Sequence, residues 1–216
     1  MAETANRTSN HPYKPLDAFL KKAKRRIQSE FNRLDAMGFD RMTVRQLYRT
    51  TAAMYERLDA YNREQYEALV LEAWTKAGGP KGKIRPKRFV KEYLDGFDPI
   101  TEYIYTQEVE RKRMRLNEAI LTAKECQSHT MLTKALRRAA NLWYTQTSQY
   151  GIDLVDRSMI AAYRIVGYDW VKWNTKMDGF ECRVCRGRNG KVYRIGEAPP
   201  KAHYQCRCWY TPVKSN

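Results

Sequence analysis

A cluster of cysteine and histidine residues near the C-terminal end constrains this chain more than any other feature. Two residues separate Cys182 from Cys185, and seventeen residues separate Cys185 from His203, which is followed by Cys206 and Cys208. Two intervening residues allow a tight turn whose thiolates converge on one ion, and a tetrahedral zinc ion needs two such pairs. The spacing therefore predicts a structural zinc site built from these five candidates.

Disulfide bonds, thiol redox chemistry and unligated thiols are the alternatives to metal binding. Disulfides require an oxidising compartment, and we expect reduced thiols because residues 1–22 contain no apolar run long enough for a signal peptide. A Cys-x2-Cys redox pair normally opens a helix after a strand. It would also leave His203 and the second cysteine pair without a role, whereas metal binding accounts for four of the five residues.

A structural zinc ion takes four protein ligands, so one of the five candidates is left over. If residues 206–208 are extended, their alternate side chains share one face, and the sulfurs of Cys206 and Cys208 both reach the ion. If instead His203 and Cys206 form a second turn-based pair, Cys208 packs as a small buried side chain. The sequence is compatible with both arrangements.

The cluster lies within a longer ordered pattern of aromatic, polar and turn-forming residues: Trp173, Thr175, Asp178, Asn189, Gly190, Pro199 and Pro200. With the cysteine groups and His203 in the same order, this pattern resembles the C-terminal domain of the minor head proteins of tailed bacteriophages, the Mu F-like head morphogenesis family. The resemblance covers roughly residues 150–213. Many relatives are longer or carry appended domains, and this chain has none after the motif.

The resemblance implies a virion protein present in few copies inside the head and assembled in the host cytoplasm. Its expected partners are the portal protein and other head proteins, together with the double-stranded DNA that is packaged or delivered. The resemblance places the zinc ligands in a small C-terminal module and implies a role in head morphogenesis.

The charge of the chain independently favours a polyanionic partner. Lysine and arginine number 40 against 24 acidic residues, which gives a formal net charge of +16. Nucleic acid and an acidic protein surface are the obvious partners for such a charge. Residues 78–88 form a glycine- and proline-rich segment that we expect to be a flexible loop, binding DNA independently of its sequence through five cations: Lys81, Lys83, Arg85, Lys87 and Arg88.

The rest of the chain predicts a mainly α fold of long amphipathic helices, followed by a small α+β module of short strands stabilised by zinc. We expect a flexible polar arm over residues 1–14, a helical body over 15–150 and the module over 151–216. No stretch has the roughly 20 apolar residues of a membrane span. Cys126 is far from the cluster, and we expect it to be a small buried side chain.

Apolar periodicity and capping signals divide the helical body. The first helix runs from about Leu16 to Gly38, and the second follows a capping box at Thr43 and Gln46 and continues to about Gly78. We expect a third helix over 100–124 after Asp98 and Pro99, a fourth from Ser128 or Thr130 to Gly151, and a fifth over 154–166. Short strands are expected over 168–173, 191–195 and 206–211.

The sequence does not favour an enzyme. A hydrolytic triad needs a histidine beside a nucleophile, and only His203 lies in an organised context, where metal binding already explains it. A metal-dependent nuclease would need a second histidine or an acidic cluster near the module. The expected function is a non-enzymatic head protein, with a sequence-independent DNA-binding protein and then a nuclease as alternatives.

Overall fold

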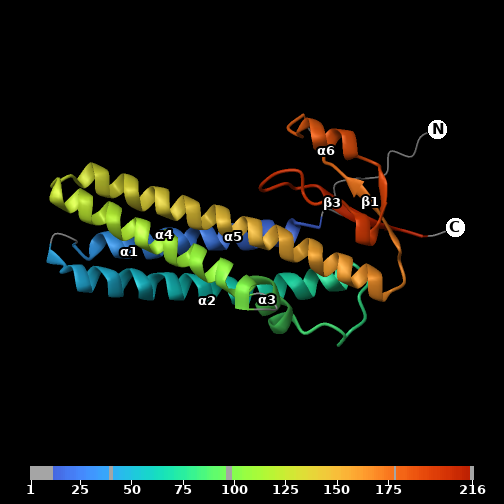
Figure 1. The fold of residues 1–216 in the computed structure, drawn as a ribbon, viewed down its shortest axis with the longest axis horizontal. Helices are drawn as coiled ribbons and strands as arrows, with labels where there is room; N and C mark the ends of the chain where they lie inside the picture. Colours follow the sequence, from blue (N-terminus) through green and yellow to red (C-terminus); the bar gives the residue numbers. More distant parts are fainter. Residues whose placement is uncertain (1–11, 39–40, 96–98, 178, 215–216) are drawn as a thin grey trace. The chain divides into compact units, whose positions relative to one another are not determined.

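The computed structural model describes residues 12–38, 41–95, 99–177 and 179–214. Long helices come first and a small antiparallel sheet comes last, which confirms the predicted fold class of a mainly α chain with a C-terminal module of short strands (Figure 1). The elements in chain order are α1 (Lys14–Ala36), α2 (Val44–Lys76), α3 (Pro86–Leu94), α4 (Pro99–Glu125), α5 (His129–Ile165), β1 (Trp170–Asn174), α6 (Arg183–Arg188), β2 (Val192–Arg194) and β3 (Trp209–Val213).

Tertiary contacts divide the chain into two compact units. We call the first the cysteine unit; its described residues are 12–18, 67–86, 148–177 and 179–214. We call the second the helical unit; its described residues are 19–38, 41–66, 87–95 and 99–147. The sequence predicted a polar arm over residues 1–14, a helical body over 15–150 and a module over 151–216. The boundaries instead fall inside α1, α2 and α5, because successive turns of a long helix can pack against different neighbours.

The helical unit has an apolar core that α1, α2, α4 and α5 build together. Phe19 packs against Tyr61 with ring centroids 6.3 Å apart, while Glu30, farther along α1, binds Arg57. Helices α1 and α2 are therefore antiparallel. The predicted apolar stripes form much of the core, which contains Ile27, Phe31, Leu34, Leu47, Met54, Tyr55, Leu58, Leu116, Ile120, Leu136, Ala140 and Trp143.

Capping signals located several helix ends correctly. The Thr43 amide donates to the Gln46 side chain at 2.8 Å, and the Gln46 amide donates back to the Thr43 hydroxyl at 3.2 Å, which is a capping box. Gly38 has a φ of +68° just after α1, a conformation that glycine adopts without strain. Helix α4 begins at Pro99 as predicted, whereas the proposed N-cap Asp98 lies outside the described residues.

The prediction of two helices separated at Gly151 was wrong. Helix α5 continues through this position without interruption, from His129 to Ile165. Gly151 is required here for a close approach, since a Cβ built on it would lie 2.4 Å from Cδ1 of Leu16. Ser128 does cap the helix as predicted, because its hydroxyl accepts a hydrogen bond from the Met131 amide at 3.3 Å.

The predicted basic loop over residues 78–88 is only partly irregular. Helix α3 begins at Pro86, and Lys87 and Arg88 lie in its first turn. Proline suits this position because its missing amide hydrogen would have no helical partner there. The preceding segment leaves α2 through Gly78, whose φ is +79°, and the Gly79 amide donates to the Trp74 carbonyl in a Schellman motif.

Two further predictions about single segments were wrong. Residues 1–11 of the expected flexible arm lie outside the described part, but Tyr13 is fully buried at the start of α1. Its ring finds partners far along the chain, which local polarity cannot indicate. Cys126 is exposed rather than buried, because it follows the last residue of α4 at the turn into α5.

The sheet of the cysteine unit has the strand order β2-β1-β3, with both pairs antiparallel. One face is buried: Val171 and Trp173 of β1 are fully buried, and Tyr210 of β3 packs edge-on against Trp173. The chain enters β1 through Gly167, which ends α5 with a φ of +88°. Among the described residues, no helix has the length and apolar character needed to cross a membrane.

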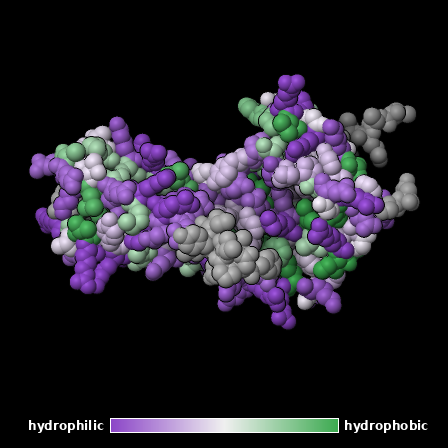
Figure 2. Space-filling view, in the orientation of Figure 1, coloured by the Kyte–Doolittle hydropathy of each residue, from purple (hydrophilic) through white to green (hydrophobic). Residues whose placement is uncertain are grey.

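Hydrophilic side chains cover most of the face seen in Figure 2, and apolar side chains occur on it in small separate groups. This distribution agrees with the high fraction of charged residues, 30% of the chain.

Candidate metal centre

The first cysteine pair is positioned by the start of α6. Cys182 is the N-cap of this helix, and its sulfur accepts a hydrogen bond from the Cys185 amide at 3.3 Å. Cys185 lies within the first turn and is buried. A backbone amide directed at a sulfur stabilises the thiolate, and this contact lowers the pKa of Cys182. The turn therefore brings both sulfurs to the same place.

The second pair is also built on a turn. The Cys206 amide donates to the His203 carbonyl at 3.2 Å, and Gln205 between them has a φ of +57°. Strand β3 begins only at Trp209, so residues 206–208 are not the strand that one interpretation of the sequence required. The turn-based arrangement of His203 and Cys206 is the one present.

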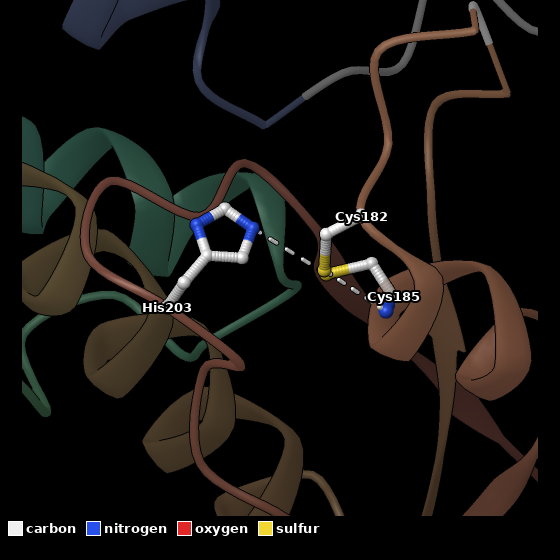
Figure 3. Close-up of side chains that lie close together, drawn as sticks. All are labelled: Cys182, Cys185 and His203. Carbon is white, nitrogen blue, oxygen red and sulfur yellow. Dashed lines mark hydrogen bonds between the residues drawn. The ribbon is translucent and has the colours of Figure 1, made fainter.

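The histidine presents one defined nitrogen to the cysteines. Its Nδ1 lies 2.9 Å from the Tyr204 carbonyl, to which it donates, and this hydrogen bond raises the pKa of His203. The tautomer with Nδ1 protonated leaves Nε2 with its lone pair exposed. Nε2 lies 3.7 Å from the Cys185 sulfur (Figure 3). A backbone contact of this kind commonly orients a histidine that binds a metal.

All five predicted candidates come together, with Cys185 at the centre. One group contains Cys182, Cys185 and His203, and the other contains Cys185, Cys206 and Cys208. Within each group the ligand atoms lie within 4.8 Å of one another, and the Cys185 and Cys206 sulfurs are 3.6 Å apart. The cluster could therefore hold a metal ion.

Hydrogen bonding to Thr175 distinguishes Cys208 from the other four candidates. The Thr175 hydroxyl donates its single hydrogen to the Cys185 carbonyl at 2.9 Å and accepts the Trp173 indole N–H at 3.0 Å. One lone pair of the Thr175 hydroxyl oxygen remains, and the Cys208 sulfur lies 3.3 Å from this oxygen. Since a hydroxyl offers one donor and two acceptor sites, this contact is satisfied when Cys208 keeps its proton. Cys208 is thus the candidate best placed to remain a thiol.

The electrostatics of the cluster agree with this assignment. The close contact between the Cys206 and Cys208 side chains lowers the pKa of Cys206 to about 4 and raises the pKa of Cys208, so Cys206 is the one of the two that loses its proton first. Burial raises the pKa of Cys185 to about 12. Without a metal ion, Cys182 and Cys206 are therefore the cysteines that ionise most readily. Cys185, which lies between them, must lose a proton to become a ligand.

The residues of the longer sequence pattern contact one another around the cluster. The Thr175 amide donates to the Asn189 side chain at 2.9 Å, and the Gly190 amide donates to the Trp173 carbonyl at 2.8 Å. Arg188 lies over the Trp173 ring at 5.1 Å. Asp178, the remaining acidic member of the pattern, lies outside the described residues.

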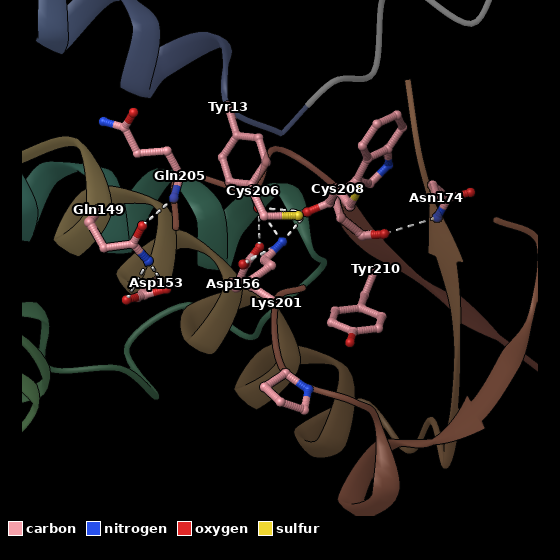
Figure 4. A network of polar contacts seen from close by, with 12 residues as sticks. Tyr13, Gln149, Asp153, Asp156, Asn174, Lys201, Gln205, Cys206, Cys208 and Tyr210 are labelled. Atoms are coloured by element: carbon pink, nitrogen blue, oxygen red, sulfur yellow. Dashed lines mark hydrogen bonds and ion pairs between the residues drawn. The ribbon is translucent and has the colours of Figure 1, made fainter. Parts of the chain in front are cut away.

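A buried polar network beside the cluster had no sequence signal (Figure 4). The Tyr13 hydroxyl lies 2.5 Å from Asp156 Oδ1, and Lys201 lies 2.8 Å from Oδ2 of the same carboxylate. Lys201 also donates to the Tyr13 oxygen and the Cys208 carbonyl. Burial raises the pKa of Asp156, and Lys201 opposes this effect. The network fixes residues 201–208 against α1 and α5.

The predicted nucleic-acid-binding cations are all exposed. Lys81, Lys83 and Arg85 lie in the irregular segment of the cysteine unit, whereas Lys87 and Arg88 belong to the helical unit. Arg88 is paired with Glu92 at 2.5 Å on the same helix. The other four have no ion-pair partner among the described residues.

Comparison of the chain with protein-family models, with curated proteins and with solved structures finds no match. The proposed function therefore rests on the geometry of the cysteine cluster and on the surfaces around it.

Proposed function

We propose that Cys182, Cys185, His203 and Cys206 hold a structural zinc ion and that Cys208 remains a neighbouring thiol. The observation that carries this proposal is the convergence of two turn-based pairs on Cys185, while Thr175 engages Cys208. Three thiolates and one imidazole form a common structural zinc set. Four protein ligands leave no position for a substrate or an activated water molecule, so the ion has a structural role.

The proposed biological role is that of a minor head protein of a tailed phage, located near the portal inside the head. The support is the resemblance of the sequence pattern, together with the finding that Trp173, Thr175, Asn189 and Gly190 contact one another around the cluster. The positive charge would face packaged double-stranded DNA, and the helices would bind the portal and other head proteins. The protein acts by binding and has no catalytic role.

Elemental analysis of the full chain, purified without chelator, tests the zinc proposal. About one zinc per chain and a loss of thermal stability after chelation are expected, because metal binding is coupled to folding in such sites. A metal-free protein that does not respond to chelator would overturn the assignment. The virion role is tested by immunodetection of the chain in purified phage particles, followed by crosslinking to identify the portal as a neighbour.

A DNA-binding protein with no place in the particle is the second candidate. The net charge and the exposed cations of residues 81–85 favour it. Such a protein would bind duplex DNA in isolation, with an affinity that falls steeply with salt, and would be absent from particles. Cleavage of DNA dependent on a divalent metal would instead support the nuclease. Among the described residues, however, the potential ligand groups contain only cysteine and histidine.

A further inference from the structure

The face of the sheet opposite the buried one carries an unusual set of side chains. Directly paired residues of antiparallel strands point to the same side, so the strand register defines the members of this face. The rows are Trp170 with Arg194 and Val213, then Lys172 with Val192 and Thr211, then Asn174 with Trp209. We call these eight residues the outer sheet face.

The outer sheet face is accessible and carries positive charge. Lys172 and Arg194 are exposed, Val192 is 47% exposed, and Trp170 is partly exposed at the centre of its row. None of the eight residues is acidic. A solvated sheet face usually mixes charges of both signs, whereas two cations beside aromatic and small apolar side chains favour a negatively charged ligand that also has flat apolar surfaces.

The arrangement of Arg194 and Trp170 adds geometry to this composition. The guanidinium of Arg194 lies over the Trp170 ring, 5.5 Å from its centre, and we call this stacked pair the platform. The Asn174 side-chain amide links β1 to β3 through a hydrogen bond to the Thr211 hydroxyl at 3.0 Å, and it also donates to the Lys172 carbonyl within β1 at 2.9 Å. The platform is thus part of a hydrogen-bonded sheet. The protein therefore loses little conformational entropy when a ligand binds there.

We propose that the outer sheet face binds single-stranded nucleic acid. An unpaired base would stack on the platform of Trp170 and Arg194, while Lys172 would contact the phosphate backbone. Duplex DNA offers phosphates to these cations but keeps its bases stacked on one another, so it cannot use the aromatic part of the face. This activity goes beyond the proposed contact with double-stranded DNA and does not require the virion role.

The test is fluorescence anisotropy of the zinc-loaded full chain with a labelled oligothymidine and with a labelled duplex. In Trp170→Leu, affinity for the single strand is expected to fall about 5- to 100-fold, in line with the energy of one aromatic–base stack, while duplex affinity changes little. Lys172→Gln and Arg194→Gln should each lower the salt slope for the single strand by about 0.7. Lys21→Gln, an exposed cation of α1, is the control for the change in net charge.

The two exposed-cation variants keep the test decisive if Trp170→Leu loses its fold. The proposal is overturned if Lys172→Gln and Arg194→Gln weaken single-strand binding no more than Lys21→Gln. It is also overturned if the three sheet variants lose duplex and single-strand binding equally. Single-strand binding by a chain that is absent from phage particles would refute the virion role and leave this inference intact.

Discussion

Gly151 of α5 lies against the side chain of Leu16 in α1, so closely that a methyl group on Gly151 would be 2.4 Å from Leu16 Cδ1. Leu16 is fully buried, so its side chain has little room to move. Glycine in the middle of a helix normally costs stability, and its presence here is explained by this approach.

Gly151→Ala is therefore expected to destabilise the chain by about 1 kcal/mol, because overpacking exceeds the gain in helix propensity. Gly187→Ala in α6 is the matched control, since a Cβ there meets nothing within 4 Å. Urea unfolding monitored by circular dichroism measures both. If the contact is the cause, adding Leu16→Ala should remove the extra effect of Gly151→Ala. An equal response of the two glycine variants would contradict the explanation.

Cys206→Ser and Cys208→Ser should behave differently although the two residues are neighbours. Cys206→Ser removes a ligand, so zinc affinity should fall by at least tenfold. Cys208→Ser should keep one zinc per chain, because a serine hydroxyl can also donate to Thr175. Cobalt substitution provides the readout through the intensity of thiolate-to-metal charge transfer. Loss of one thiolate from the cobalt spectrum of Cys208→Ser would show that Cys208 is a ligand.

Cys182→Ser or Cys185→Ser should unfold the C-terminal part of the cysteine unit while most of the helical signal remains. The short strands depend on the metal, whereas the helical unit has its own apolar core. Near-ultraviolet circular dichroism reports the first effect, because Trp173 and Tyr210 pack beside the cluster. Cys126→Ser is the control, since Cys126 is exposed and remote in sequence. Cooperative unfolding of this part in both cluster variants would exclude a structural metal.

The ion pair of Glu30 and Arg57 should make the stability of the helical unit depend on pH. Arg57 donates hydrogen bonds to the buried Glu30 carboxylate and lowers its pKa. A lowered pKa stabilises the fold above the ordinary carboxyl value of about 4.3, and this contribution is lost as pH falls through the lowered value. Glu30→Gln should cost about 1–2 kcal/mol at pH 7 and much less near pH 3. The exposed Glu64→Gln should show neither effect.

Local signals predicted much of the helical fold. The capping box of Thr43 and Gln46 and the stop at Gly38 depend only on residues within a few positions, so sequence patterns describe them well. Gly151 was misinterpreted because its reason for being glycine is Leu16, which is 135 positions away in the chain. A pattern of apolar spacing contains no information about such a distant neighbour.

The candidate site shows the same limit. The cysteine spacing predicted which five residues meet, because two-residue turns are local. The position of Cys208 depends on Thr175, and the network of Tyr13, Asp156 and Lys201 joins three distant segments. These partners become neighbours only after α5 and the sheet have packed. The sequence pattern therefore predicts the candidate ligands but contains no signal for the side chains that position them.

The contacts of Tyr13 also impose an order on biosynthesis. Its hydroxyl contacts Asp156 and the Cys208 carbonyl, which lie 143 and 195 positions later in the chain. The helical unit, which ends at residue 147, can form its helix pairs while the ribosome is still translating the rest of the chain. The contacts of Tyr13 must wait until almost the whole polypeptide has been made, and until then its aromatic side chain lacks these partners.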